Sequence, residues 1–290
     1  MITIQVPATT ANLGPGFDSC GLALNLYLTL EVGQEQAVWQ IDHQLGESIP
    51  TDESNLIIQT ALSIVSTLTP RKLRMKSEIP STRGLGSSSA AIVAGIELAN
   101  QVAQLNLTSM EKLEIAATIE GHPDNVAPAI MGDFVVASQL GKEIFAVKYP
   151  FPETSLLAVI PNHELLTKES RTVLPQTLTY SEAVKASSIS NVMISAVLTG
   201  DLDLAGQMMA RDLWHEIYRK ELVPHLSPIR KLADANGAYG TFLSGAGPTV
   251  LVLLSKDRLK EMKLLLQEKF KKAVVKELTI DRLGVQAKKQ

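Results

Sequence analysis

The most informative stretch of the sequence is Ile79-Pro80-Ser81-Thr82-Arg83-Gly84-Leu85-Gly86-Ser87-Ser88-Ser89-Ala90-Ala91, a short turn that leads into an alanine-rich segment. Its two glycines let the backbone turn tightly and approach a ligand closely. We predict a helix from about Ser87 to Gln104, whose first N–H groups lack an intrahelical partner and whose dipole adds about half a positive charge at that end. Free N–H groups, positive potential and three hydroxyls are typical of a phosphate site. A serine-capped helix after a flexible turn would explain the same residues.

Three better-known motifs do not fit this stretch. A P-loop requires a lysine before its serine or threonine, and no lysine lies between Lys76 and Lys112. A Rossmann fingerprint requires a third glycine, but Ser89 stands at that position. A nucleophile elbow requires Gly-x-Ser-x-Gly, and Ser88 is followed by serine and alanine. If this stretch is a phosphate-binding loop, it is therefore of a type other than these three motifs.

The bulk composition is that of an ordinary globular protein. The chain has 290 residues, a hydrophobic content of 45% and a net charge of −3, so nothing indicates a surface for nucleic acid or an anionic membrane. The lone cysteine, Cys20, excludes an intrachain disulfide framework and favours a reducing cytoplasm. The N-terminus has no basic region typical of a signal peptide, and no apolar run is long enough to span a membrane.

The pattern along the chain predicts an α+β fold with two domains, residues 1–150 and 151–290. The boundary is placed at Tyr149-Pro150-Phe151-Pro152, because two close prolines rarely interrupt one element. In the first part we predict strands within 1–40, 75–79, 134–137 and 144–147, and helices over 55–68 and 109–119. In the second part we predict strands at 156–160, 240–243, 249–254 and 273–280, and helices at 181–198, 201–213, 225–235 and 257–271.

Other polar segments carry groups suited to binding. The loop Pro7–Asp18 offers an amide and a carboxylate, and the segment 120–128 combines two carboxylates with His122 and Asn125. Glu120 could help hold Mg²⁺ if it faces the serines of the glycine loop. The segments 167–171 and 218–224 each carry an arginine, which can clamp a carboxylate. Ser244–Thr249 is a second glycine-rich loop. Each of these segments also has a plain structural interpretation, as a turn, a cap or a surface.

Three segments in this order resemble the GHMP small-molecule kinase superfamily: Pro7–Asp18, Pro80–Ser88 and Ser244–Thr249. The resemblance spans nearly the whole chain. It implies an N-terminal α/β domain that carries the phosphate loop and a C-terminal ferredoxin-like domain, with ATP and the acceptor in the cleft between them. Within the superfamily, the segments 8–18, 122–128, 171–175 and 218–219 are most similar to members that phosphorylate the hydroxyl of L-homoserine to O-phospho-L-homoserine, a step of threonine biosynthesis.

The resemblance also implies roles for individual residues. The residues expected to bind ATP are Pro80, Ser81, Thr82, Arg83, Gly84, Leu85, Gly86, Ser87, Ser88, Ser89 and Ala90. Ser88 and Glu120 would hold Mg²⁺. Those expected to bind L-homoserine are Asn12, Asp18, His122, Asn125, Thr167, Arg171 and Arg219. The group expected to act in catalysis is Asn12, Glu120, Asp124, Asn125 and Arg171. Asp18 suits the ammonium of the substrate and the arginines suit its carboxylate.

Some points stay open at this stage. Mevalonate-type members of the superfamily place a lysine in the first loop and use an aspartate as base, whereas residues 8–18 contain no lysine. The hydroxyl proton could pass to Asp124, to Asn125 or to a γ-phosphate oxygen, and the role of His122 is undecided. The alternative functions are another GHMP enzyme, such as a mevalonate-pathway kinase, and a non-catalytic ligand-binding regulator. A homodimer is one candidate assembly.

Overall fold

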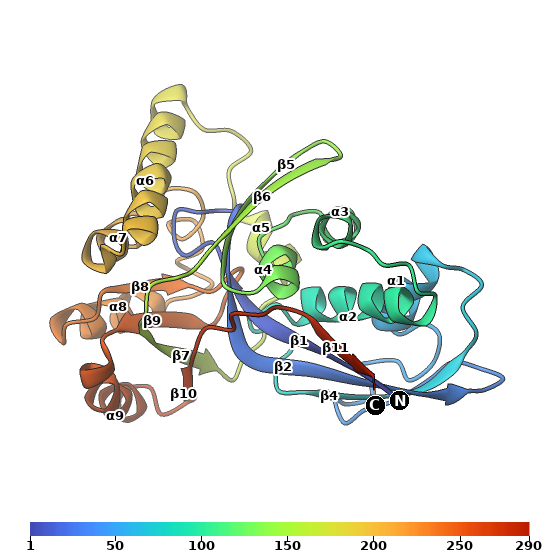
Figure 1. The fold of residues 1–290 in the computed structure, drawn as a ribbon. Helices are drawn as coiled ribbons and strands as arrows, with labels where there is room; N and C mark the ends of the chain where they lie inside the picture. Colours follow the sequence, from blue (N-terminus) through green and yellow to red (C-terminus); the bar gives the residue numbers. More distant parts are fainter. Residues whose placement is uncertain (290) are drawn as a thin grey trace.

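The computed structural model describes residues 1–289 of the chain, and the N-terminal part is built on a large sheet. Within these residues the sheet has seven strands, in the order β11-β1-β2-β4-β3, with β5 on β2 and β6 on β5 (Figure 1). The strands are β1 (Ile2–Ala11), β2 (Cys20–Glu35), β3 (Gln40–Asp42), β4 (Arg71–Ser77), β5 (Phe134–Leu140), β6 (Glu143–Tyr149) and β11 (Gln286–Lys289). β2 alternates buried and partly exposed residues along much of its length, as expected for a strand with one face on a core.

Four helices accompany this sheet: α1 (Leu56–Ile64), α2 (Ser87–Val102), α3 (Ser109–Glu120) and α4 (Val126–Met131). The amide oxygen of Asn55 caps α1, and Thr108 with Glu111 forms a capping box at the start of α3. Helix α2 packs on α1, α3, α4 and β1, and eleven of its residues are buried. A helix surrounded in this way needs small and apolar residues on most sides, which explains its alanine-rich sequence.

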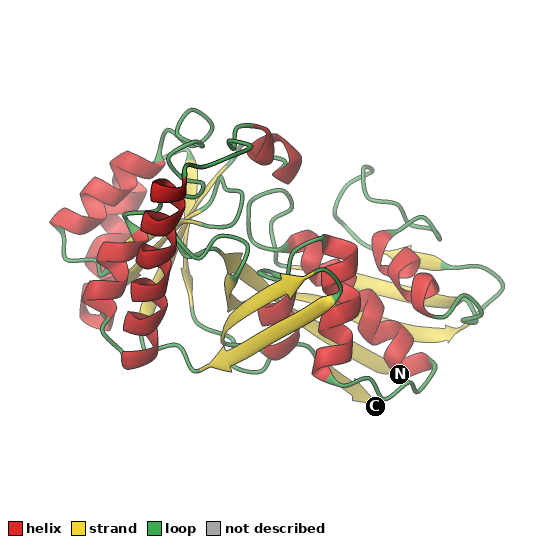
Figure 2. Cartoon of the chain, turned by 90° about the horizontal axis from the view of Figure 1, so that it is seen from above, coloured by secondary structure: helices red, strands yellow, loops and turns green. Residues whose placement is uncertain are grey.

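The second sheet is antiparallel, with the order β10-β7-β9-β8. Its strands are β7 (Ser155–Pro161), β8 (Gly240–Leu243), β9 (Val250–Leu254) and β10 (Ala273–Leu278). The helices are α5 (Thr167–Thr172), α6 (Tyr180–Thr199), α7 (Leu202–Met209), α8 (Leu226–Ala235) and α9 (Leu259–Lys269), and a 3₁₀ turn, η1 (Lys256–Arg258), precedes α9. The helices α6, α7, α8 and α9 gather on one side of the molecule, whereas α5 lies nearer its middle (Figure 1 and Figure 2). This strand order is that of a ferredoxin-like domain, so the predicted fold class is confirmed.

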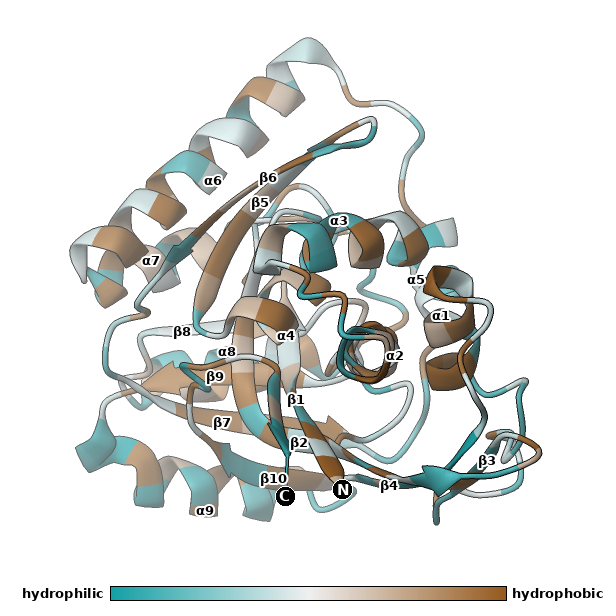
Figure 3. Cartoon of the chain, turned by 45° about the vertical axis from the view of Figure 1, so that its right-hand side comes forward, coloured by the Kyte–Doolittle hydropathy of each residue, from teal (hydrophilic) through white to brown (hydrophobic). Residues whose placement is uncertain are grey.

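Both faces of β7 and β9, the central strands of the second sheet, are buried, and Figure 3 colours these two strands as largely apolar. Leu157 and Val159 of β7 face the cluster formed with α8 and α9. Leu156, Ala158 and Ile160 point the other way, into a core shared with α6, α7 and the first domain. The period of two in a strand sends alternate residues to opposite faces. One continuous core therefore joins the two domains.

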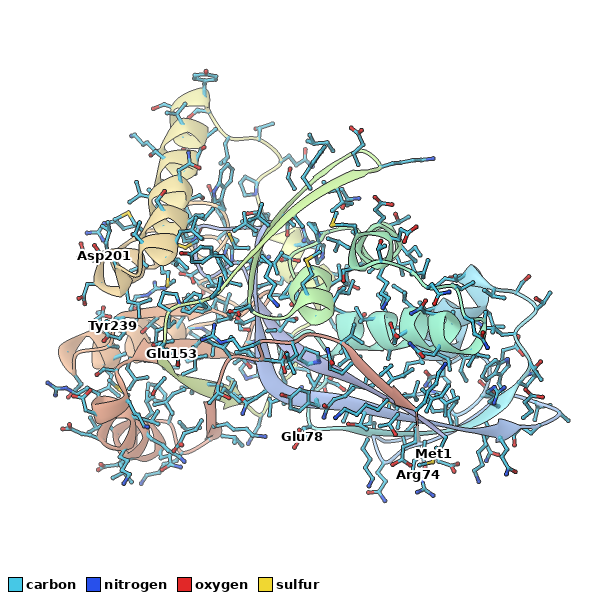
Figure 4. All side chains as sticks on the ribbon, in the orientation of Figure 1. Met1, Arg74, Glu78, Glu153, Asp201 and Tyr239 are labelled. Atoms are coloured by element: carbon cyan, nitrogen blue, oxygen red, sulfur yellow. The ribbon has the colours of Figure 1, made fainter. Side chains whose placement is uncertain are left out.

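The end of the chain returns to the first domain. After β10, residues 279–285 cross back, and β11 pairs with β1 in antiparallel register. The Arg282 guanidinium bonds the carboxylates of Asp133, at 2.6 Å, and Glu153, at 2.8 Å. Glu153, which precedes β7, is labelled in Figure 4 beside the sheet of the second domain. This ion-pair cluster fastens the interdomain linker to the returning segment.

Most of the predicted elements are present with shifted ends, and four elements that were not predicted correct the sequence-based picture: β3, α4, α5 and β11. The strand predicted over 273–280 ends at Leu278 and is followed by β11, so it does not end the fold. The short helix α4 was not predicted, because it follows a Pro-Asp-Asn segment and contains Pro128. The division at residue 150 stays a prediction. No helix within residues 1–289 combines the length and the apolar character needed to cross a membrane.

Candidate active site

A cleft between the two domains collects the predicted site residues. It contains about 780 Å³ of space not filled by atoms, and its walls come from the β1–β2 loop, the loop before α2, the α3–α4 connection, α5, the α7–α8 segment and the β8–β9 loop. All the predicted acceptor, catalytic and metal residues line it: Asn12, Asp18, Ser88, Glu120, His122, Asp124, Asn125, Thr167, Arg171 and Arg219. They lie far apart in the sequence, so the packing of the two domains brings them together.

In the glycine loop, the backbone carbonyls are hydrogen-bonded within residues 1–289, whereas the N–H groups are not. The carbonyl oxygens of residues 82–86 accept hydrogen bonds, in order, from Leu165 N, Thr249 N, Ser244 Oγ, Thr9 N and Ala90 N. The N–H groups of residues 84–89 have no acceptor within the described part of the chain. Gly86, with a φ of 70°, is the N-cap of α2 and supplies no side-chain cap. The interpretation as a serine-capped helix is therefore wrong, and the free N–H groups form a concave site for an anion.

Not every residue of this loop faces the cleft. Thr82, Gly84, Gly86, Ser87, Ser88 and Ser89 line it. The other predicted residues of the loop do not line the cleft: Pro80, Ser81, Arg83, Leu85 and Ala90. Leu85 and Ala90 are fully buried. The Arg83 side chain turns away and donates to the carbonyls of Pro161, at 3.1 Å, and Asn162, at 2.7 Å. Its guanidinium thus holds the loop against the second domain.

Oxygen ligands suited to a divalent cation flank the start of α2. The Ser89 hydroxyl donates to Glu120 Oε1 at 2.9 Å, which brings the end of α3 to the first turn of α2. Glu120 Oε2 has no partner among the described residues, and both Glu120 and the exposed Ser88 line the cleft. Mg²⁺ prefers a few hard oxygen ligands from the protein and takes the others from water and phosphate. The donor set fits that ion.

Two arginines and an aspartate face the loop from the other side of the cleft. The Arg171 guanidinium bonds both carboxylate oxygens of Asp18, at 2.6 and 3.1 Å. Arg219 is only 2% exposed, and it donates to the carbonyls of Ser170 and Gly245. No acceptor for its Nη2 is found within residues 1–289, although that atom is not sealed from solvent. One nitrogen of a buried arginine is thus left for an anion.

Aromatic contacts keep the two arginines close together. The Phe17 ring lies 5.6 Å from the guanidinium carbon of Arg171 and 5.5 Å from that of Arg219, which is the range of a cation–π contact. Phe17 also stacks on His215 at 5.1 Å. Burial, followed by the nearby charge of Arg171, lowers the pKa of Arg219 to about 10. A negatively charged ligand would relieve the repulsion between the two cations.

Each end of the Asn12 amide makes one hydrogen bond to the protein, which leaves the second hydrogen of its NH₂ group without an acceptor among the described residues. Its Nδ2 donates to the Gly245 carbonyl at 3.1 Å, and its Oδ1 accepts from the Asp18 N–H at 3.1 Å. Asn12 has a φ of 75°, a conformation that asparagine tolerates better than most residues. It thereby joins the β1–β2 loop to the β8–β9 loop. Its predicted contacts with the substrate stay predictions.

A polar chain runs along the α3–α4 connection. His122 Nδ1 lies 2.6 Å from Asp124 Oδ1, Asn125 Nδ2 lies 3.4 Å from the same oxygen, and the Thr9 hydroxyl donates to Asn125 Oδ1 at 2.8 Å. Burial opposes the charged form of His122, but the hydrogen bond and charge of Asp124 outweigh it and raise the pKa of His122. Ligand atoms of Asp18, His122 and Asp124 lie within 4.8 Å of one another. This corner therefore suits a cationic group of a substrate.

The comparison with known proteins agrees with this arrangement. The model of the GHMP kinase N-terminal domain matches residues 55–133, and that of the C-terminal domain matches residues 193–272. Together they cover more than half of the chain. The chain belongs to the GHMP kinase family. As a kinase, it uses ATP as its phosphoryl donor, and the predicted resemblance is confirmed.

Full-length relatives of this GHMP kinase carry one name. A homoserine kinase from Enterococcus faecalis is 58% identical over 98% of this chain and 99% of its own length. One from Listeria innocua is 63% identical over 88% of each chain. The crystal structure of a homoserine kinase from Cytophaga hutchinsonii has a TM-score of 0.87 and 28% identity, covering 99% of this chain and 97% of its own. This GHMP kinase thus shares the fold over nearly its entire length.

Proposed function

We propose that this GHMP kinase transfers the γ-phosphoryl group of ATP to the side-chain hydroxyl of L-homoserine, giving O-phospho-L-homoserine and ADP. The observation that carries the proposal is the Nη2 of buried Arg219, for which residues 1–289 supply no acceptor. It lies in the same cleft as the Asp18–Arg171 pair and the glycine-loop N–H groups. An α-amino acid bears its carboxylate and ammonium on one carbon. Adjacent cationic and anionic side chains match both charges, and the names of the relatives support the same substrate.

The transfer is written as a direct displacement. The hydroxyl oxygen of homoserine forms a bond to the γ-phosphorus while the bond from that phosphorus to the β–γ bridging oxygen breaks. ADP leaves with the electron pair of the broken bond. The hydroxyl proton passes to an oxygen of the transferred phosphoryl group and from there to water. Asp124 is not used as the base in this scheme, because it already accepts from His122 at 2.6 Å.

Catalysis then rests on position and charge. The N–H groups of residues 84–89 donate to phosphate oxygens, and the start of α2 adds its positive potential. Ser88 and Glu120 would hold Mg²⁺, which when bound neutralises charge on the phosphates. Phosphoryl transfer needs little covalent participation from the protein, so such a site can accelerate it. His122 and Asp124 line the acceptor end near Asp18.

A turnover assay separates the candidate functions. ADP release is measured with saturating ATP and Mg²⁺ and with L-homoserine, mevalonate or 3-aminopropan-1-ol, which is homoserine without its carboxylate. We expect rapid turnover only with L-homoserine, confirmed by a phosphorus NMR signal of the phosphate monoester. Preferential use of mevalonate would favour another GHMP activity. ATP binding without turnover of any acceptor would favour a non-catalytic regulator.

A further inference from the structure

Thr9, which the sequence did not single out, lies where the glycine loop meets the acceptor half of the cleft. It is fully buried in β1. Its backbone N–H donates to the Leu85 carbonyl at 3.2 Å, and its hydroxyl donates to Asn125 Oδ1 at 2.8 Å. A Cβ added to Gly86 would lie 2.1 Å from the Thr9 hydroxyl and 3.3 Å from Asn125 Oδ1. Thr9 therefore joins the phosphate loop, through its backbone N–H, to Asn125, through its hydroxyl.

These contacts fix the orientation of the Asn125 amide. Asp124 Oδ1, an acceptor when ionised, lies 3.4 Å from Nδ2, so the NH₂ group must be on that side. Oδ1 then faces Thr9, whose hydroxyl must donate. The NH₂ group carries two hydrogens, and only the Asp124 oxygen is found as an acceptor for it within residues 1–289. Asn125 lines the cleft and is partly exposed, so its second N–H is available to a ligand.

We propose that Thr9 is a positioning residue, which holds Asn125 so that its N–H, and not its carbonyl oxygen, faces the reacting groups. The assignment rests on the proposed function. In this orientation Asn125 donates to an oxygen of the phosphoryl group or to the acceptor hydroxyl, and it cannot take the hydroxyl proton. Without the Thr9 hydroxyl, the long 3.4 Å bond to Asp124 is the one contact found within residues 1–289 that still opposes rotation of the amide, and in the rotated form the amide oxygen would repel the phosphate.

The test compares Thr9→Val, which keeps the shape and removes the hydroxyl, with Thr9→Ser, which keeps the hydroxyl. Steady-state kinetics are measured with L-homoserine and ATP. We expect Thr9→Val to lower kcat about 10- to 100-fold, the range of a lost hydrogen bond to a buried polar group, with KM for both substrates changed less than 3-fold. Thr9→Ser should stay within about 3-fold of the wild type. Thr241→Val is the matched control, because its buried hydroxyl has no partner within residues 1–289 and lies in β8, outside the cleft.

A double-mutant cycle shows whether Thr9 acts through Asn125. In an Asn125→Ala background, Thr9→Val should change kcat less than 2-fold, since contacting groups of one network are not additive. Equal effects in both backgrounds, or a fully active Thr9→Val enzyme, would overturn the proposal. If Thr9→Val does not fold, as judged by circular dichroism, Thr9→Ala replaces it in both backgrounds. Failure of the wild type to phosphorylate homoserine would instead overturn the proposed function.

Discussion

Replacing Arg171 with glutamine tests the amino-acid substrate most directly. Glutamine is neutral, and it can keep one hydrogen bond to Asp18 while losing the positive charge. A charge-assisted hydrogen bond contributes about 1.5–3 kcal/mol, which corresponds to roughly 10- to 150-fold in affinity. The Arg171 side chain is 36% exposed, so solvent weakens the interaction and we expect the lower end, a rise of about 10- to 20-fold in KM for L-homoserine. KM for ATP should change less than 2-fold.

The assay uses ADP release at saturating ATP and Mg²⁺, with L-homoserine and 3-aminopropan-1-ol as acceptors. The amino alcohol keeps the hydroxyl and ammonium but has no carboxylate for Arg171. The wild type should use it poorly, and Arg171→Gln should lose little further activity on it. Arg258→Gln, at the exposed start of α9, controls for the loss of one surface charge. An equal loss on both acceptors would refute the reasoning, because Arg171 would then act on ATP or on folding.

The other predictions concern the phosphate loop and the acceptor corner. Ser88→Ala and Glu120→Gln should each lower kcat about 10²- to 10³-fold at saturating ATP and Mg²⁺, with little effect on KM for homoserine. Near-normal turnover of both variants would refute their assignment to the Mg²⁺ site. Gly86→Val should abolish ATP binding in calorimetry while circular dichroism shows a folded chain, because its Cβ would lie 2.1 Å from the Thr9 hydroxyl; unchanged affinity would contradict this. The pKa of His122 is raised above 6.5, so its stabilising contribution is present below pH 6.5 and is lost as the pH rises through the folded-state pKa. Thermal unfolding should therefore show a larger advantage of the wild type over His122→Gln at pH 6 than at pH 8.5, and an equal advantage at both would count against it.

The sequence was informative where local chemistry alone decides the structure. The glycine loop, the start of α2 and the capping asparagine of α1 follow from residues that are adjacent in the chain. The polar segments were recognisable as candidate site segments for the same reason, since glycine, asparagine and aspartate are unusual where a strand should continue. The continuous apolar run from Leu156 to Ile160 likewise predicted the strand β7.

The contacts of long side chains, and the pairing of short strands, could not be predicted from neighbouring residues in the sequence. Arg83 and Arg219 look alike in sequence, yet Arg83 donates to carbonyls outside the cleft and Arg219 is buried beneath it. Which carbonyl an arginine reaches depends on how distant loops pack. Phe17 was quoted within a loop, but its contact with two guanidinium groups depends on α5 and the α7–α8 segment. β11 has the sequence Gln-Ala-Lys-Lys, which shows no apolar alternation, and only its pairing with β1 makes it a strand.

The glycines of the phosphate loop are needed for a reason that the sequence suggested only in part. A Cβ at Gly84 would lie 2.3 Å from the Ser244 carbonyl oxygen, so glycine here leaves room for the β8–β9 loop of the second domain. The carbonyl of the same residue accepts from the Ser244 hydroxyl at 2.6 Å. The close approach that glycine permits is therefore between two parts of the protein. Because their carbonyls are held in this way, the N–H groups stay directed into the cleft before ATP arrives, and an arrangement fixed in advance costs little reorganisation during the reaction.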